Sequence, residues 1–182
     1  MATGYDSDDY SFIDNVDEYK CAICHCVTKE PTLTSCCGNH YCQSCIERVL
    51  RQRRPCPLCS RSGLEVFLDK KQKRRILALK VHCTLRSQGC EWTGNLGDLE
   101  THVDHNYGSC GFVRIECSQC TRRIQRRKLD GHKETDCPKR PWKCNHCEYQ
   151  TTHDKQRDHT SVCTRFPVPC PNSCQRKRIE RG

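Results

Sequence analysis

Cysteines in close pairs constrain this chain more than any other feature. The 182 residues contain 20 cysteines, and half of them stand in Cys-x2-Cys pairs. Two sulfurs so close in sequence fit two corners of a tetrahedral metal site better than an unstrained disulfide. Histidines follow the pairs at fixed offsets, which favours a zinc protein of a reducing compartment over a secreted disulfide scaffold. The sequence therefore predicts Zn2+ as the cofactor.

Metal coordination would also supply folding free energy that packing lacks. Only 35% of the residues are hydrophobic, and that figure includes the cysteines. A chain of this composition is unable to bury one large core. The N-terminus lacks the basic and apolar regions of a secretory signal, and the longest aliphatic run, 76–79, is too short to span a bilayer. We expect a small zinc-stabilised α+β protein with a cytoplasmic location and no membrane segment.

The formal net charge of +9 suggests an anionic partner, but metal coordination changes the count. Zinc binds thiolates, so a four-cysteine site carries −2 with its ion, and a site of three cysteines and one histidine carries −1. One site of the first kind and four of the second lower the charge to about +3. Five basic residues remain within 122–128, so a nucleic-acid-binding zinc-finger protein stays an alternative. The spacing of the fingers differs from that of DNA-reading fingers, which makes nucleic acid the less expected partner.

The chain before the repeats falls into three predicted segments. Residues 1–18 are acidic and lack cysteine, which indicates a flexible leader, with the alternative that Phe12, Ile13 and Val16 pack on the first module. The i, i+3, i+4 spacing of Ile46, Val49 and Leu50 predicts a short helix inside a metal-binding module at 19–62. Alternating apolar residues from 64 to 68 predict a strand, and the run of helix formers at 70–80 predicts a linker helix. We assign this strand and linker helix to 63–81.

An internal repeat with periods of 30, 27 and 27 residues follows, from 83 to 174. Eleven residues lead from the second cysteine of each unit to a histidine, and a last cysteine comes after it. Eleven residues suffice to finish a hairpin and begin a helix, on which His and Cys return to the remaining corners of a tetrahedron. The ligand sets are Cys83, Cys90, His102 and Cys110; Cys117, Cys120, His132 and Cys137; and Cys144, Cys147, His159 and Cys163.

These units predict three complete ββα-like Cys-Cys-His-Cys zinc fingers at 82–112, 113–139 and 140–166. A fourth begins at 167–182 with Cys170 and Cys174 but has no room for its histidine, so we expect the natural protein to continue. Each unit is too small to hold its own core, which favours neighbours that brace one another in a rod. Trp92 and Trp142 are expected to pack between modules.

The first module offers enough ligands for two further zinc ions, five in all. The predicted ligands are Cys21, Cys24, Cys37, His40, Cys42, Cys45, Cys56 and Cys59. The segment 36–40 leaves alternatives open: Cys36 can take the place of Cys37 beside His40, or both cysteines can bind without His40. We favour Cys37 with His40, because adjacent side chains reach one ion awkwardly.

The order Cys-x2-Cys, Cys-x-x-His, Cys-x2-Cys, Cys-Pro-x-Cys resembles a RING finger. A RING followed by a basic helix and tandem fingers resembles the tumour-necrosis-factor-receptor-associated factors, the TRAF family. Segments 73–80, 89–94 and 137–141 also fit that family, and the resemblance covers 19–174. One departure is Asn39, which stands where RING fingers of this type carry the histidine. The resemblance implies a cross-braced pairing, with Cys21, Cys24, Cys42 and Cys45 on one ion and Cys37, His40, Cys56 and Cys59 on the other.

The resemblance further implies the activity of a RING-type E3 ubiquitin-protein ligase, which acts by positioning and has no catalytic residue of its own. Ile23 and Pro57 match the residues that dock a ubiquitin-conjugating enzyme. Ser60 stands where many active RINGs place a long basic residue, and this favours the alternative of a zinc-dependent signalling adaptor without ligase activity. The implied partners are the conjugating enzyme, ubiquitin and a second copy of the RING. Receptor or adaptor binding is expected from the coiled coil and β-sandwich that follow in the family.

Overall fold

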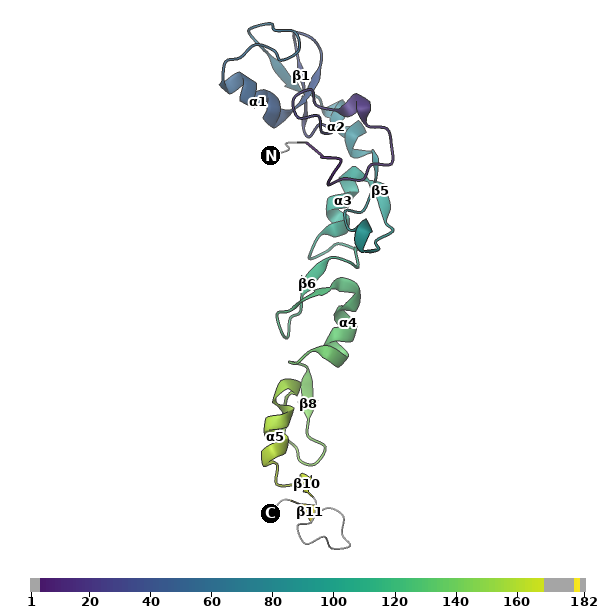
Figure 1. The fold of residues 1–182 in the computed structure, drawn as a ribbon, viewed down its shortest axis with the longest axis vertical. Helices are drawn as coiled ribbons and strands as arrows, with labels where there is room; N and C mark the ends of the chain where they lie inside the picture. The colour runs from purple at the N-terminus through teal and green to yellow at the C-terminus, as the bar shows by residue number, and fades with distance from the viewer. Residues whose placement is uncertain (1–3, 169–178, 181–182) are drawn as a thin grey trace. The chain divides into compact units, whose positions relative to one another are not determined.

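The computed structural model describes residues 4–168 and 179–180. The chain divides into two compact units, Met1–Val113 and Arg114–Gly182. The first unit contains the first module, the linker helix and finger one, and the second contains fingers two and three (Figure 1). None of the helices in the described part of the chain has the length and apolar composition needed to span a bilayer.

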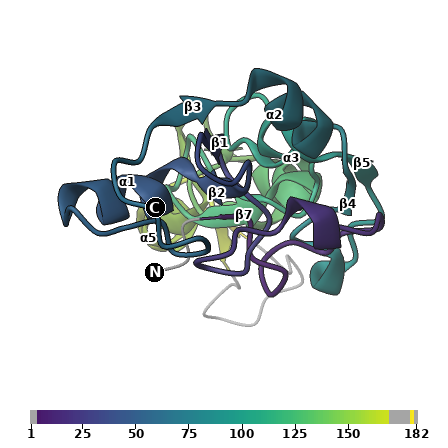
Figure 2. The same cartoon turned by 90° about the horizontal axis from the view of Figure 1, so that it is seen from above.

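A three-stranded antiparallel sheet organises the first module (Figure 2). Its strands are β1 (Pro31–Thr34), β2 (His40–Cys42) and β3 (Val66–Leu68), in the order β2-β1-β3. Helix α1 (Gln43–Arg51) follows β2 directly and buries Cys45 and Ile46, which confirms the helix predicted from apolar spacing. Together with Cys21, Tyr41 and Cys42, these side chains form a small core. The sheet thus brings its metal ligands and its apolar side chains to the same place.

The linker helix and finger one share a second core. Helix α2 (Lys70–Leu77) leads into the hairpin of β4 (Lys80–His82) and β5 (Thr93–Asn95), which a short 3-10 turn η2 (Arg86–Gln88) interrupts, and α3 (Leu96–Val103) follows. The buried residues of this core are Val27, Ile76, Leu79, Val81, Leu96 and Leu99. Because Val27 belongs to the first module and the others to α2 and finger one, apolar packing joins these segments into one unit.

The N-terminal segment is not the loose leader that its acidic composition predicts. Tyr5 pairs with Val27 and Phe12 pairs with Val81 as antiparallel bridges, and the purple segment lies beside α2 in Figure 1. The Lys80 amide donates to Asp14 Oδ2 at 2.7 Å, and a short 3-10 turn η1 (Asp17–Tyr19) precedes the first zinc ligand. Aromatic side chains between the acidic residues hold the segment in place, because Tyr5, Tyr10 and Phe12 pack on the second core.

Fingers two and three repeat the hairpin-and-helix pattern that the spacing predicts. Finger two consists of β6 (Arg114–Glu116), β7 (Arg123–Gln125), η3 (Arg126–Lys128), α4 (Leu129–Gly131) and a π-helical turn η4 (His132–Asp136). Finger three consists of β8 (Pro141–Lys143), β9 (Gln150–Thr152), η5 (His153–Lys155) and α5 (Gln156–Val162). A last strand pair joins β10 (Pro167–Val168) to β11 (Ile179–Glu180). The predicted ligands Cys170 and Cys174 lie outside the described residues.

We predict that Phe12→Ala loosens finger one, whereas Ile13→Ala does not. The Phe12 ring packs on the second core, but the Ile13 side chain is 50% exposed. Loss of a partly buried ring should cost about 1–2 kcal/mol, or a roughly five- to thirty-fold change in the opening equilibrium. Hydrogen exchange followed by mass spectrometry should therefore show faster exchange in peptides covering 76–99 for Phe12→Ala. Equal exchange in the two variants would contradict the packing role of the segment.

Candidate metal centres

Five groups of four side chains bring one potential ligand atom each to within 4.8 Å of one another in the described part of the chain. Two groups consist of cysteines alone and belong to the first module. The other three each contain three cysteines and one histidine and belong to the fingers. The groups are Cys21, Cys24, Cys42, Cys45; Cys36, Cys37, Cys56, Cys59; Cys83, Cys90, His102, Cys110; Cys117, Cys120, His132, Cys137; and Cys144, Cys147, His159, Cys163.

The distances within these groups fit a tetrahedral zinc ion. A Zn–S bond of about 2.3 Å gives a tetrahedron with sulfur–sulfur edges of about 3.8 Å. The Sγ–Sγ distance is 3.8 Å for Cys24–Cys42 and for Cys37–Cys56, and 4.0 Å for Cys144–Cys163. In all three fingers the histidine presents Nε2 to a cysteine sulfur, at 3.2–3.4 Å. The donor sets, soft thiolates with imidazole, suit Zn2+, and this chain is a zinc-binding protein.

The two sites of the first module interleave along the chain. The first and third pairs of ligands, 21–24 and 42–45, form one group, and the turn at 36–37 joins the pair at 56–59 in the other. Each site therefore joins two segments of the chain, and in the sequence a ligand pair of the other site lies between those segments. This alternation holds the loops between the ligands in place without a large apolar core.

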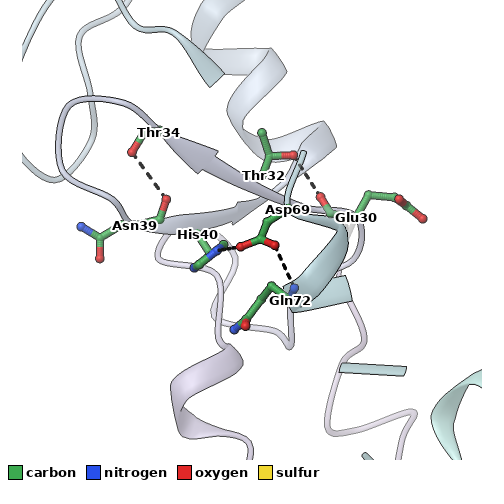
Figure 3. Close-up of polar contacts among 7 residues, drawn as sticks. All are labelled: Glu30, Thr32, Thr34, Asn39, His40, Asp69 and Gln72. Atoms are coloured by element: carbon green, nitrogen blue, oxygen red, sulfur yellow. Dashed lines mark hydrogen bonds and ion pairs between the residues drawn. The ribbon is translucent and has the colours of Figure 1, made fainter. Parts of the chain in front are cut away.

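Position 40 is where the structure departs from the predicted ligand set. Cys36 takes the place of His40, so that adjacent cysteines 36 and 37 both join the second group. The His40 ring instead lies beside Asp69, with Nε2 3.0 Å from Oδ2 (Figure 3). The β1–β2 turn explains the difference: Gly38 has φ +68°, a left-handed conformation that folds the chain back directly after the two cysteines.

Asp69 connects this part of the sheet to the linker helix. Its Oδ1 accepts the Gln72 amide at 2.9 Å and caps α2, while Oδ2 faces His40 on β2 (Figure 3). The hydrogen bond from the Gln72 amide, followed by that from His40, lowers the pKa of Asp69. In this arrangement His40 faces the carboxylate that caps the helix.

Hydrogen bonds around the second site favour the thiolate of one of its two adjacent cysteines. Interactions with Asn39 and Thr34 lower the pKa of Cys37 to about 6, and Thr34 Oγ1 lies 3.3 Å from its sulfur. Loss of solvation raises the pKa of Cys36 to about 12. A bound cation would stabilise both thiolates, because metal ligation requires deprotonated sulfur.

Three of the five Cys-x2-Cys pairs share one backbone conformation. The residue after the second cysteine has a left-handed backbone at His25, Ser60 and Thr121, with φ between +57° and +59°. The amide of each donates to the carbonyl of the first cysteine, at 2.8–2.9 Å. Sulfur in turn accepts backbone amides elsewhere in the sites, as from Leu85 to Cys83 at 3.3 Å. These amide dipoles stabilise the thiolates that hold the ion.

Aromatic rings stack on the ligand histidines of fingers one and three. The Trp92 ring lies 4.3 Å from the His102 ring at an interplanar angle of 9°, and Tyr149 lies 4.3 Å from His159 at 6°. Trp142 approaches His159 at 5.7 Å. Each tryptophan thus lies against the histidine of its own finger, and Trp92 also packs on the second core, as expected of a residue between modules. The signal was present in the sequence: Trp92 and Tyr149 both stand two residues after the second cysteine.

The long connection between His102 and Cys110 is stabilised locally. Helix α3 ends at Val103, as the spacing predicts, and the Cys110 amide donates to the His102 carbonyl at 2.9 Å. His102 Nδ1 lies 2.9 Å from Ser109 Oγ, which holds the ring with Nε2 toward the sulfurs. A Cβ at Gly108 would lie 2.5 Å from the backbone oxygens of His102 and Asp104, so only glycine fits this turn.

Cys26 stays outside the five groups in the described residues. It is buried, and its sulfur lies 3.3 Å from the Cys24 carbonyl oxygen. Burial raises the pKa of Cys26 to about 11, so its thiol stays protonated at neutral pH. This residue is a structural thiol beside the first site.

The two predicted docking residues differ in exposure. Ile23 is half-buried and packs against the core that includes Tyr41 and Ile46, whereas Pro57 is exposed. Leu58, which the sequence reasoning left out of the site, is 53% exposed beside Pro57. Both Pro57 and Leu58 lie between ligands of the second site, so the metal fixes the loop that presents them.

We predict that Cys36→Ser lowers zinc stoichiometry from five ions to four, and that His40→Ala keeps five. Cys36 belongs to a tetrahedral group, whereas His40 faces Asp69. Native mass spectrometry of the chain measures bound zinc directly, and thermal unfolding gives a second reading. His40→Ala should still lower the melting temperature, because Asp69 loses one of its partners. Loss of one zinc in His40→Ala, with full occupancy in Cys36→Ser, would restore His40 as the ligand.

Comparison with known proteins agrees with these centres. Residues 105–159 match the model of the TRAF-type zinc finger family. The chain is 34% identical over 175 residues to TNF receptor-associated factor 5 of Mus musculus, and the aligned region covers 91% of this chain and 30% of that protein. It is 34% identical over 165 residues to TNF receptor-associated factor 6-B of Xenopus laevis (89% and 28%), and 28% identical over 176 residues to TNF receptor-associated factor 2 of Homo sapiens (90% and 34%).

The chain spans about a third of the length of these curated relatives. Their similarity nonetheless runs through about nine-tenths of this chain, across the first module and the fingers. The family match and the five ligand groups point to the same assignment, and the chain belongs to the TRAF family.

Proposed function

We propose that this chain is the ligase region of a TRAF-type signalling protein, in which the first module is a RING-type E3. The interleaving of two four-cysteine groups is the observation that carries the proposal. It supports a module that holds two loops rigidly without a catalytic side chain. A rigid surface of this kind accelerates ubiquitin transfer by positioning a conjugating enzyme and its ubiquitin thioester for attack by a lysine.

The proposed docking surface consists of Ile23, Pro57 and Leu58. Ile23 lies between two ligands of the first site and is only half-buried, so part of its side chain stays available to a partner. Pro57 and Leu58 lie between two ligands of the second site and are exposed. Apolar side chains held in place by metal lose little conformational freedom on binding, which favours their use as anchors.

The ligands of the five sites serve this function indirectly. Coordination to a cation neutralises the thiolates and makes them poor nucleophiles, so no covalent step is assigned to them. We propose that the fingers space and orient the RING, and that receptors or adaptors bind other regions of the full-length protein in the cytoplasm.

A second candidate function is a zinc-dependent adaptor without ligase activity. Ser60 favours it, because this short side chain follows the last ligand, where many active RINGs carry a long basic residue. The backbone of Ser60 is left-handed, with φ +57°, so the chain turns directly after the last ligand. Arg61 comes one position later, and its carbonyl accepts the Cys56 amide at 2.9 Å.

We predict that Ile23→Asp reduces ubiquitin-chain formation by on the order of tenfold or more, because it places a charge in an apolar docking surface. The assay combines the chain with ubiquitin, activating enzyme and a panel of conjugating enzymes. Val162→Asp is the matched control, since Val162 is 71% exposed and lies in finger three. Zinc content measured on both variants separates loss of docking from loss of folding.

Two outcomes decide between the candidate functions. If Ile23→Asp forms ubiquitin chains as fast as the parent protein, Ile23 does not belong to the docking surface. No chain formation by the fully zinc-loaded parent chain across the whole panel would favour the adaptor.

A further inference from the structure

Finger two carries a surface that the ligase function does not use. Six basic side chains lie within its hairpin and the 3-10 turn that follows, and we name them the basic hairpin: Arg114, Arg122, Arg123, Arg126, Arg127 and Lys128. All except Arg126 are classed as exposed. Arg114 and Arg123 lie on the neighbouring strands β6 and β7, which are about 4.8 Å apart, and the other four residues directly flank β7 in the sequence.

The register of the hairpin separates its charged residues from its apolar ones. Arg114 lies opposite Gln125 and Arg123 lies opposite Glu116, and opposed residues share one face of a strand pair. Ile115 and Ile124 oppose each other on the other face and are half-buried. The Arg123 guanidinium donates to the Arg114 backbone carbonyl at 3.4 Å, which places the Arg123 side chain across the strand pair from its own backbone.

Four of these cations, Arg114, Arg122, Arg123 and Lys128, differ from the paired cations of finger three. There Lys143 pairs with Glu148 at 3.0 Å, and the nearby Lys139 pairs with Asp154 at 2.6 Å. Within the described residues, no acidic side chain forms an ion pair with Arg114, Arg122, Arg123 or Lys128. Glu116 is the one acid on the strands of the hairpin. The local field of finger two therefore stays positive even though bound thiolates lower the charge of the whole chain.

Position 122 sharpens the contrast between the fingers. It stands two residues after the second cysteine, as do Trp92 and Tyr149, the aromatic residues that stack on ligand histidines in fingers one and three. Finger two has arginine at this position, which adds an exposed cation beside the hairpin.

We propose that the basic hairpin binds the phosphate backbone of a nucleic acid. Five of its six cations are arginines, whose planar guanidinium groups match phosphate oxygens in pairs. None of the large exposed hydrophobic side chains of the described chain lies between 114 and 128. The surface therefore lacks the apolar anchors that membranes and protein partners use, whereas a phosphate backbone needs only the cations. Recognition is electrostatic and independent of base sequence.

The test measures binding of the zinc-loaded chain to a fluorescein-labelled 20-nucleotide RNA of mixed sequence, single-stranded and as its duplex, across a range of salt concentrations. The test variant combines Arg114→Gln, Arg123→Gln and Lys128→Gln. The matched control combines Lys143→Gln, Lys155→Gln and Arg157→Gln, which removes the same charge from finger three. Zinc content verifies that both variants fold.

We expect salt-sensitive binding of one or both RNA forms. The slope of log K against log salt should fall by about 2–3 in magnitude in the test variant, since each lost phosphate contact contributes about 0.7–0.9. The control should keep the parent slope. Absence of RNA binding at 50 mM salt, or equal loss in both variants, overturns the proposal. Tighter binding of polyglutamate of matched length or of phosphatidylserine vesicles overturns it as well, in favour of an acidic protein or a membrane surface.

Discussion

Tetrahedral coordination by thiolate and imidazole is the constraint on which this structure depends. Each site brings four side chains to the corners of a tetrahedron with edges of about 3.8 Å, and every site except that of finger one takes two of its ligands from one short turn. A strand pair of three residues or a helix of seven has little stability alone in water. Metal coordination makes such short elements sufficient, which is why all helices and strands of the described residues are short.

Apolar packing connects segments that metal coordination leaves unconnected. The core of Val27, Ile76, Leu79, Val81, Leu96 and Leu99 joins the first module to finger one, because no metal site contains ligands from both. The N-terminal aromatic side chains cover this core. Residues 1–113 therefore form one compact unit although their two kinds of zinc module differ. The acidic charge of the segment obscured this role, since Tyr5, Tyr10 and Phe12 are few among many polar residues.

Side chains around the ligands give each site a distinct character. Rings stack on His102 and His159, and Ser109 orients His102, whereas finger two has arginine where the others have an aromatic residue. The zinc geometry stays the same in all three fingers. The surfaces differ, and so the fingers can take different partners while performing the same structural task.

The sequence by itself predicted the metal, the number of ligand clusters, the residues that gather in the three fingers, and the helix after Cys45, the linker helix and the hairpin and helix of each finger. The spacing of cysteines and histidines predicts these features, because ligands of one tetrahedral site must lie a few ångströms apart. Short stretches of chain between two ligands therefore need a fixed number of residues. Three features appear only in the tertiary structure: the fourth residue of the second ligand cluster, the packing of the N-terminal segment and the rings stacked on His102 and His159. Cys36 and His40 are both near enough in sequence to bind. The left-handed turn at Gly38 allows Cys36 to join the second ligand cluster. The carboxylate of Asp69, 29 residues beyond His40, binds the histidine ring instead. Contacts between distant residues have no period in the sequence, and for this reason spacing alone was unable to reveal them.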